Sequence, residues 1–119
     1  EDLARGVMSR HFDAPLVPGQ VPGVHKEWDM VSPDGDIVGD AKYFTLVHGQ
    51  RLPPAKFSVI GEHVWLLEKT EAPTTFLVFG NDRQVPELWL ERYGSLVAGV
   101  SFFFLGDEGD LEQLSYTEA

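Results

Sequence analysis

The stretch Ser32-Pro33-Asp34-Gly35 constrains the fold of this chain more than any other feature. Proline presets the backbone angle of the second turn position, aspartate suits the third, and glycine accepts the conformation that closes the turn. On both sides, β-branched and aromatic residues alternate with polar ones, which is typical of paired strands. The sequence therefore predicts a β-hairpin within residues 25–45, HKEWDMVSPDGDIVGDAKYFT.

The predicted hairpin carries two aspartates and a lysine, Asp29, Asp40 and Lys42. If the turn closes between its first and fourth residues, Asp29 lies opposite Val38 and diagonal to Asp40. Because side chains alternate between the faces of a strand, the two aspartates and the lysine then share one face. A bulge in the turn would shift this pairing by one residue.

This pattern, Asp29 followed by a short hairpin and then Asp40-Ala41-Lys42, resembles the active-site signature of the PD-(D/E)XK nuclease-like superfamily. That superfamily includes restriction endonucleases, Holliday-junction resolvases and repair exonucleases. The resemblance implies a restriction-endonuclease-like core of helix, three strands, helix and strand, with the two acids on consecutive strands. The chain departs from the signature at two points. Trp28 stands where the motif has proline, and the second acid is aspartate rather than the more usual glutamate.

The resemblance also implies an activity, that of a metal-dependent phosphodiesterase or nuclease. Asp29, Asp40 and the carbonyl of Ala41 are then expected to bind Mg²⁺ or Mn²⁺, hard cations that prefer oxygen ligands and lower the pKa of a bound water. Lys42 is expected to orient that water or to stabilise the charge of the transition state. The simpler alternative is a surface charge cluster that stabilises the fold by less than about 1 kcal/mol.

Helices of the superfamily often contribute further side chains to the site. The first helix often supplies another acid, and Glu1 or Asp2 is placed for that role, although both also suit the start of a helix as ordinary charges. The following helix often carries a polar or basic residue near the site, and Lys56 would fit, with a solvated helix lysine as the simpler interpretation. The four histidines are scattered singly and are expected to be core or surface residues.

The other elements are predicted from hydrophobic spacing and from turn residues. In chain order they are a helix over 1–12, an irregular stretch or short edge strand over 13–23, a helix over 55–69, a buried strand over 74–80, a short helix starting at Pro86, a strand over 97–105 and an acidic tail from Gly106 that frays or ends in a short helix. A long helix between the hairpin and the next strand is what a parallel crossover requires. The sequence thus predicts one α/β domain with a mixed (α+β) sheet over 1–119, made of a core over about 1–80 and a C-terminal helix and strand within 81–119.

Composition limits the class of protein. A chain of 119 residues is long enough for one hydrophobic core. It has no cysteine, so neither a disulfide nor a thiolate metal site is expected. No apolar run reaches membrane-spanning length and none resembles a signal peptide, so we expect a cytoplasmic protein with no membrane partner. Because the chain begins at Glu1 rather than Met, an upstream signal remains open.

Charge bears on the partner. Nineteen acidic residues against nine Lys and Arg give a net charge of −10, which argues against strong nonspecific binding to phosphate backbones. Four basic residues nevertheless lie in or just after the hairpin: Lys26, Lys42, Arg51 and Lys56. Two functions stay open, a nuclease acting on DNA (or RNA) and a catalytically inactive acidic module that binds a basic protein partner. In either case the phenylalanines at 102–104 are a candidate homodimer interface, unless helices cover both faces of their strand.

Overall fold

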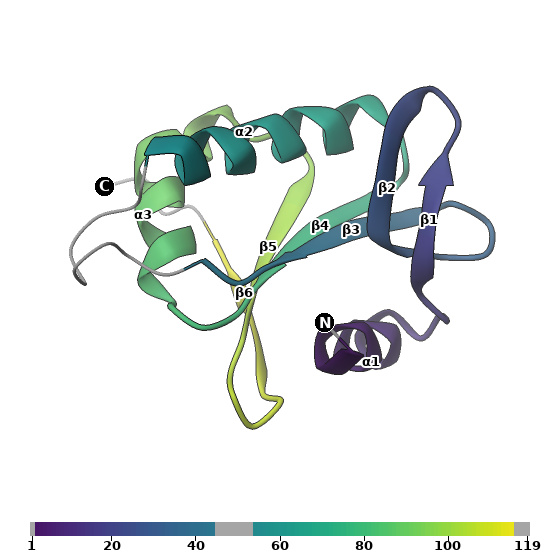
Figure 1. Cartoon of the computed structure of the whole chain (residues 1–119), viewed down its shortest axis with the longest axis horizontal. Coiled ribbons are helices and arrows are strands. Elements are labelled where there is room, and N and C mark those ends of the chain that lie inside the picture. The colour runs from purple at the N-terminus through teal and green to yellow at the C-terminus, as the bar shows by residue number, and fades with distance from the viewer. Residues whose placement is uncertain (1, 45–53, 116–119) are drawn as a thin grey trace.

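The computed structural model describes residues 2–44 and 54–115. Its elements are α1 (Asp2–Phe12), β1 (Val17–Val21), β2 (Val24–Val31), β3 (Ile37–Lys42), α2 (Pro54–Lys69), β4 (Thr74–Phe79), α3 (Gln84–Tyr93), the short 3₁₀ turn η1 (Gly94–Leu96), β5 (Val100–Leu105) and β6 (Leu111–Leu114). The strands form one six-stranded sheet in the order β1-β2-β3-β4-β5-β6 (Figure 1). The three central strands, β3, β4 and β5, are parallel, and the outer pairings are antiparallel. The predicted α/β class with a mixed sheet is confirmed.

Helices cover both faces of this sheet. α2 and α3 lie on one face, and α1 lies on the other (Figure 1). The buried side chains fall into two matching clusters, and β4 supplies both of them. Leu77 and Phe79 pack beneath α2 and α3, whereas Phe76 and Val78 pack on the side of α1. The prediction that this strand is buried on both faces is confirmed.

The aromatic side chains of β5 are also divided between the two faces. Phe102 stacks on Phe79 and Trp89, with ring centroids 5.6 and 5.4 Å away. Phe103 packs edge-on against Phe12 of α1, at 6.2 Å. Each of these two phenylalanines of β5 is only 2% exposed. The sequence left open whether these phenylalanines are covered on both faces or form a homodimer interface. At Phe102 and Phe103, both faces are covered by helices.

The two edge strands differ in how well they were predicted. β1 is an edge strand that contains Pro18, where a missing N–H is tolerated, as expected for this proline-rich stretch. After Gly106, a short helix or frayed tail was expected, but over Leu111–Leu114 the chain forms β6, which pairs with β5 as an edge strand; residues 116–119 lie outside the described residues. Gly106 N donates to Asp110 O at 2.8 Å across the connecting turn, and Gly109 supplies the positive φ of 90° that this turn requires.

No helix within the described ranges is long and apolar enough to cross a membrane.

The register of the central hairpin differs from the prediction. Its turn is where we expected it, since Gly35 N donates to Ser32 O at 2.9 Å. The strands, however, pair Val38 with Val31 rather than with Asp29. The pair that closes the loop is therefore Ser32 and Ile37 rather than Ser32 and Gly35, so the loop is longer by two residues, both on the side of β3.

Side-chain hydrogen bonds hold this longer loop. Asp34 Oδ1 accepts from Ser32 Oγ at 2.7 Å and from Asp36 N at 3.0 Å, and Ser32 Oγ in turn accepts from Ile37 N at 3.0 Å. Ser32 N closes the loop by donating to Ile37 O. These polar contacts favour the wider closure, which shifts the pairing by two residues and places the two aspartates next to the paired residues Met30 and Gly39.

Candidate functional site

Asp40 and Lys42 lie at the carboxyl end of β3, beside the carboxyl ends of the parallel strands β4 and β5. In sheets of this kind, ligands commonly bind at the carboxyl ends of the strands. Side chains two residues apart on a strand share a face. Here it is the face covered by α2, because His63 of that helix approaches Asp40. The fold therefore presents an acid and a lysine side by side beneath α2.

Asp29 joins them through the backbone of the neighbouring strand. The pairing of β2 with β3 ends at Met30 and Gly39, and there β2 turns away from β3 (Figure 1). Asp29 N donates to Asp40 Oδ1 at 2.8 Å, and Ala41 N donates to Asp29 Oδ2 at 2.9 Å. Each carboxylate thus binds a backbone N–H of the opposite strand. The structure brings together all three residues of the predicted signature at the point where the strands diverge.

Three nitrogen atoms surround one oxygen of Asp40. Its Oδ2 lies 3.0 Å from Lys42 Nζ, 3.2 Å from Lys26 Nζ and 3.5 Å from His63 Nδ1. The Asp40 side chain is only 3% exposed. Burial alone would raise its pKa, but the Lys42 charge, the N–H of Asp29 and the Lys26 charge outweigh burial and lower the pKa below its usual value. Asp40 is therefore an ionised carboxylate at neutral pH.

His63 contributes no charge to this cluster at neutral pH. Burial, followed by the Lys42 and Lys26 charges, lowers its pKa to about 4 and outweighs the attraction of Asp40. The distance of 3.5 Å to Asp40 is therefore a contact with a neutral imidazole rather than an ion pair. Its Nδ1 is buried and has no hydrogen-bond partner within the described part of the chain.

Two of these residues, Lys26 and His63, were not predicted as site residues. Lys26 was expected only as one of the basic residues of the hairpin, and His63 was counted among the scattered histidines. For Lys56 of α2, the simpler interpretation of a solvated helix lysine agrees with its placement. Lys56 is exposed, and its Nζ stands 4.9 Å from the ring centroid of Phe44. The available signal was the placement of His63 next to the buried stripe formed by Ile60 and other apolar residues of α2.

Of the two acids expected from the first helix, Asp2 lies within the described residues, and it does not reach this cluster. Glu1 lies outside the described residues. The Asp2 side chain is 99% exposed and pairs with Arg5 at 3.0 Å. α1 also lies on the face of the sheet opposite α2 (Figure 1). The suggestion that Asp2 takes part in the site is therefore wrong.

The donors fit a hard cation that keeps part of its water. Asp29 and Asp40 supply carboxylate oxygens from adjacent strands. The N–H and C=O of a strand residue point the same way, so the Ala41 carbonyl faces the β2 side together with its N–H. Within residues 2–44 and 54–115, no three His, Cys, Asp or Glu side chains are grouped to hold a metal ion. Mg²⁺ commonly binds through one or two carboxylates and retains several waters, which matches this donor set.

Comparisons with protein-family models, with curated proteins and with solved structures found no match. What the chain does is therefore inferred from the arrangement of its own side chains. The cluster around Asp40 is the part of the described structure where two ammonium groups and a neutral imidazole meet on one carboxylate oxygen.

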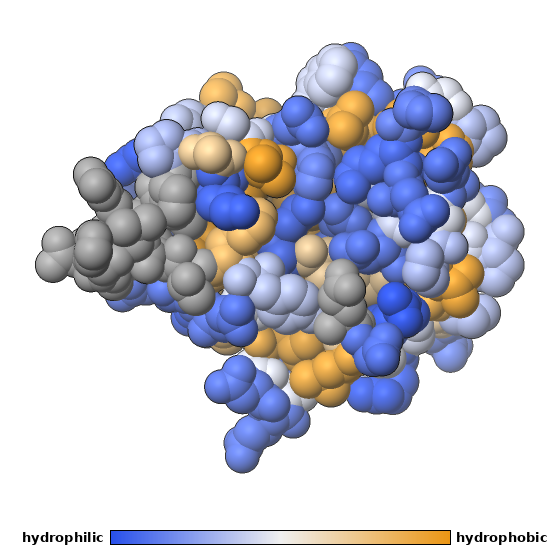
Figure 2. Space-filling model, viewed as in Figure 1, coloured by the Kyte–Doolittle hydropathy of each residue, from blue (hydrophilic) through white to orange (hydrophobic). Residues whose placement is uncertain are grey.

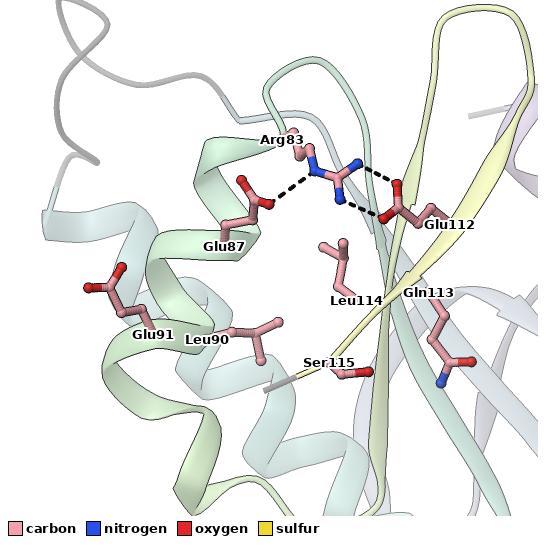
Figure 3. A pocket seen from close by; sticks show the side chains of 8 residues that line it. All are labelled: Arg83, Glu87, Leu90, Glu91, Glu112, Gln113, Leu114 and Ser115. Carbon is pink, nitrogen blue, oxygen red and sulfur yellow. Dashed lines mark hydrogen bonds and ion pairs between the residues drawn. The ribbon is translucent and has the colours of Figure 1, made fainter. Parts of the chain in front are cut away.

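A second region, between α3 and β6, is a pocket with a volume of about 350 Å³. Figure 3 shows Arg83 bridging its two walls. Arg83 Nε donates to Glu87 at 3.0 Å, and both terminal nitrogens donate to Glu112, one of them at 2.6 Å. The guanidinium is thus committed to two carboxylates, so this region fastens the edge strand to α3 rather than offering a free cation.

A third region is an apolar groove of about 350 Å³ between α2 and α3. Its lining includes Trp65 and Leu96, which are 55% and 78% exposed. The side of the molecule seen in Figure 2 is mostly hydrophilic, with separate small hydrophobic areas. The groove holds aromatic and aliphatic side chains without a group of catalytic residues. The Asp40 cluster remains the candidate for chemistry.

Proposed function

We propose that the chain is a metal-dependent phosphodiesterase that cleaves nucleic acid, with DNA as the first substrate to test. The observation that carries this proposal is the pairing of Asp29 with Asp40 across two diverging strands, with Lys42 Nζ 3.0 Å from the second carboxylate. The order of elements also supports a PD-(D/E)XK core. α1, three antiparallel strands, α2 and the parallel strand β4 follow one another as that superfamily implies.

In this proposal, Asp29, Asp40 and the Ala41 carbonyl hold Mg²⁺ or Mn²⁺. A cation bound there supplies Lewis acidity and makes a bound water more acidic. Lys42 is 9% exposed and held by Asp40, so its ammonium is fixed in direction before substrate arrives. A fixed positive charge of this kind stabilises the negative charge that develops on phosphoryl oxygens, and it requires little rearrangement during the reaction.

The distribution of charge favours the nuclease over the alternative. Lys26 and Lys42 converge on Asp40 in a chain whose net charge is −10, so the site is locally less acidic than the molecule as a whole. These two ammonium groups would attract a phosphate towards this part of the chain. The alternative is a catalytically inactive acidic module that binds a basic protein partner. The net charge of the chain and the burial of Asp40 are the observations in its favour. It predicts that Asp40 matters for stability alone.

A cleavage assay tests this function. Wild-type protein, Lys42→Met and Lys69→Met would be incubated with single- and double-stranded DNA and RNA in Mg²⁺, in Mn²⁺ and in EDTA. We expect cleavage only with a divalent cation, and a loss of about 10²- to 10³-fold in Lys42→Met, the size typical for removing one group that stabilises transition-state charge. Lys69→Met removes the same charge from an exposed helix position and should cleave like wild type. Absence of cleavage of every substrate by folded wild type, or cleavage that persists in EDTA, contradicts the proposal.

A further inference from the structure

The Asp40 cluster has more positive groups than one carboxylate oxygen needs. Lys42 Nζ and Lys26 Nζ lie 3.0 and 3.2 Å from the same atom, Asp40 Oδ2. A buried carboxylate without a partner is costly, so one ammonium group has a clear structural purpose. The second ammonium group, that of Lys26, lies beside Asp40 Oδ2, in space that a cation bound to this oxygen would need.

The two lysines are held differently. Lys42 is on the same strand as Asp40, hydrogen-bonds to it and is 9% exposed. Lys26 comes from β2, is 20% exposed and lies over the ring of Trp28, with Nζ 4.8 Å from the ring centroid. Lys26 Nζ also donates a hydrogen bond to the carbonyl oxygen of Glu27 at 3.3 Å. Lys26 can therefore move towards solvent on its four-carbon stem at less cost than Lys42.

We propose that Lys26 is a built-in counter-ion that occupies the cation position at Asp40 Oδ2, and that a divalent metal ion binds by displacing it. This inference rests on the proposed metal site. It explains how Asp40 stays buried and ionised before the metal arrives. Because coupling between two occupants of one site is reciprocal, Lys26 weakens metal binding by the same factor by which the metal weakens the contact between Lys26 and Asp40.

Calorimetric titration of Mn²⁺ into three proteins tests the competition. Wild type would be compared with Lys26→Met and with Lys56→Met, which removes the same charge from an exposed lysine over Phe44. We expect Lys26→Met to bind Mn²⁺ about tenfold more tightly or better, within the range usual for coupled sites. Lys56→Met should bind close to wild type, because Lys56 does not contact Asp40. The long-range effect of losing one positive charge is common to both variants, so a difference between them reports the contact of Lys26 with Asp40.

The outcomes separate the two proposals. Mn²⁺ binding by wild type with equal or weaker binding by Lys26→Met overturns the role of Lys26 and leaves the metal site standing. No binding by either protein overturns the metal site, and the inference about Lys26 falls with it. Binding by Lys26→Met alone supports both, with Lys26 as the stronger competitor.

A measurement on unmodified protein covers the case in which Lys26→Met fails to fold. Lysine side chains labelled with ¹³C at Cε report on their surroundings by NMR, and Lys26 should carry a ring-current shift from Trp28. Saturating Mg²⁺ should remove that shift and narrow the Lys26 signal as the side chain is released, while the Lys42 signal stays broad. A Lys26 signal that keeps its ring-current shift at saturating Mg²⁺ contradicts displacement.

Discussion

At Asp40, burial and charge act against each other. Taking an ionised carboxylate out of water costs several kcal/mol unless hydrogen bonds and opposite charges compensate. Here both oxygens are engaged, Oδ1 by the backbone of Asp29 and Oδ2 by two lysines. The neighbouring His63 stays neutral for the complementary reason, since the same lysines and its burial disfavour a further positive charge.

The neutral state of His63 predicts how the stability of the metal-free protein depends on pH. Its pKa is about 4 in the folded chain, below the ordinary 6.5, so the unfolded chain binds more protons between these values. The stabilisation is therefore present above pH 6.5 and is lost as pH falls towards 4. Urea denaturation in EDTA across this range should show the loss in wild type and much less of it in His63→Gln.

A matched control separates this effect from the general loss of a histidine. His25 is exposed, so His25→Gln should keep the pH dependence of wild type. The Asp40 pKa is also lowered, but its contribution is lost only at more acidic pH, below the ordinary value of 3.8. Equal pH dependence in wild type and His63→Gln would contradict the assignment.

Single residues of the site were predictable from sequence where the relation was local. The acid and the lysine at 40 and 42 share a face because they are two residues apart on one strand. Asp29 was found from the resemblance to the nuclease signature. Lys26 and His63 were missed because their contacts with Asp40 span 14 and 23 positions and depend on how β2 and α2 are placed.

At the scale of elements, the side chain of Phe76 in β4 packs directly against the backbone of Gly39 in β3. These two residues are partners in the parallel ladder, and a Cβ at Gly39 would overlap the ring of Phe76. The ring of Phe76 thus fills the space that a side chain at position 39, the residue before Asp40, would occupy. The site depends on this contact because it sets the course of β3.

A methyl group at Gly39 should therefore disturb the sheet. We expect Gly39→Ala to lower the free energy of unfolding by about 1 to 3 kcal/mol, as overpacked cores do, measured by urea denaturation. Gly61→Ala is the matched control, because a Cβ there would only contact Trp89 at 3.9 Å and glycine is unfavourable within a helix. That variant should be as stable as wild type or more so. A Gly39→Ala protein of wild-type stability would contradict the close packing.

The elements themselves were largely predictable, while their pairing was less so. The turn at Ser32 to Gly35, the helix over 54–69 and the buried strand β4 follow from local turn chemistry and apolar spacing. The hairpin register was wrong because hydrogen bonds of Asp34 favour a longer loop. β6 was missed because its four residues, LEQL, carry little strand signal and are defined by pairing with β5.

At the scale of the whole molecule, the acidic composition and the proposed substrate are reconciled by position. The net charge of −10 belongs to the entire chain, whereas two of its nine Lys and Arg residues converge on one buried carboxylate. That carboxylate lies at the carboxyl end of the parallel strands, beneath α2. Local charge at this end of the sheet, rather than total charge, governs the approach of a phosphate.

The most direct test of the account is whether Asp40 binds a divalent cation. Mn²⁺ would be titrated calorimetrically into wild type, Asp40→Asn and Asp36→Asn, the last of which removes an exposed carboxylate from the same hairpin. We expect micromolar binding by wild type and Asp36→Asn, and its loss in Asp40→Asn with the fold intact. Folded wild type and Lys26→Met proteins that both bind no Mn²⁺, or an Asp40→Asn variant that binds it as tightly as wild type, would contradict the metal site.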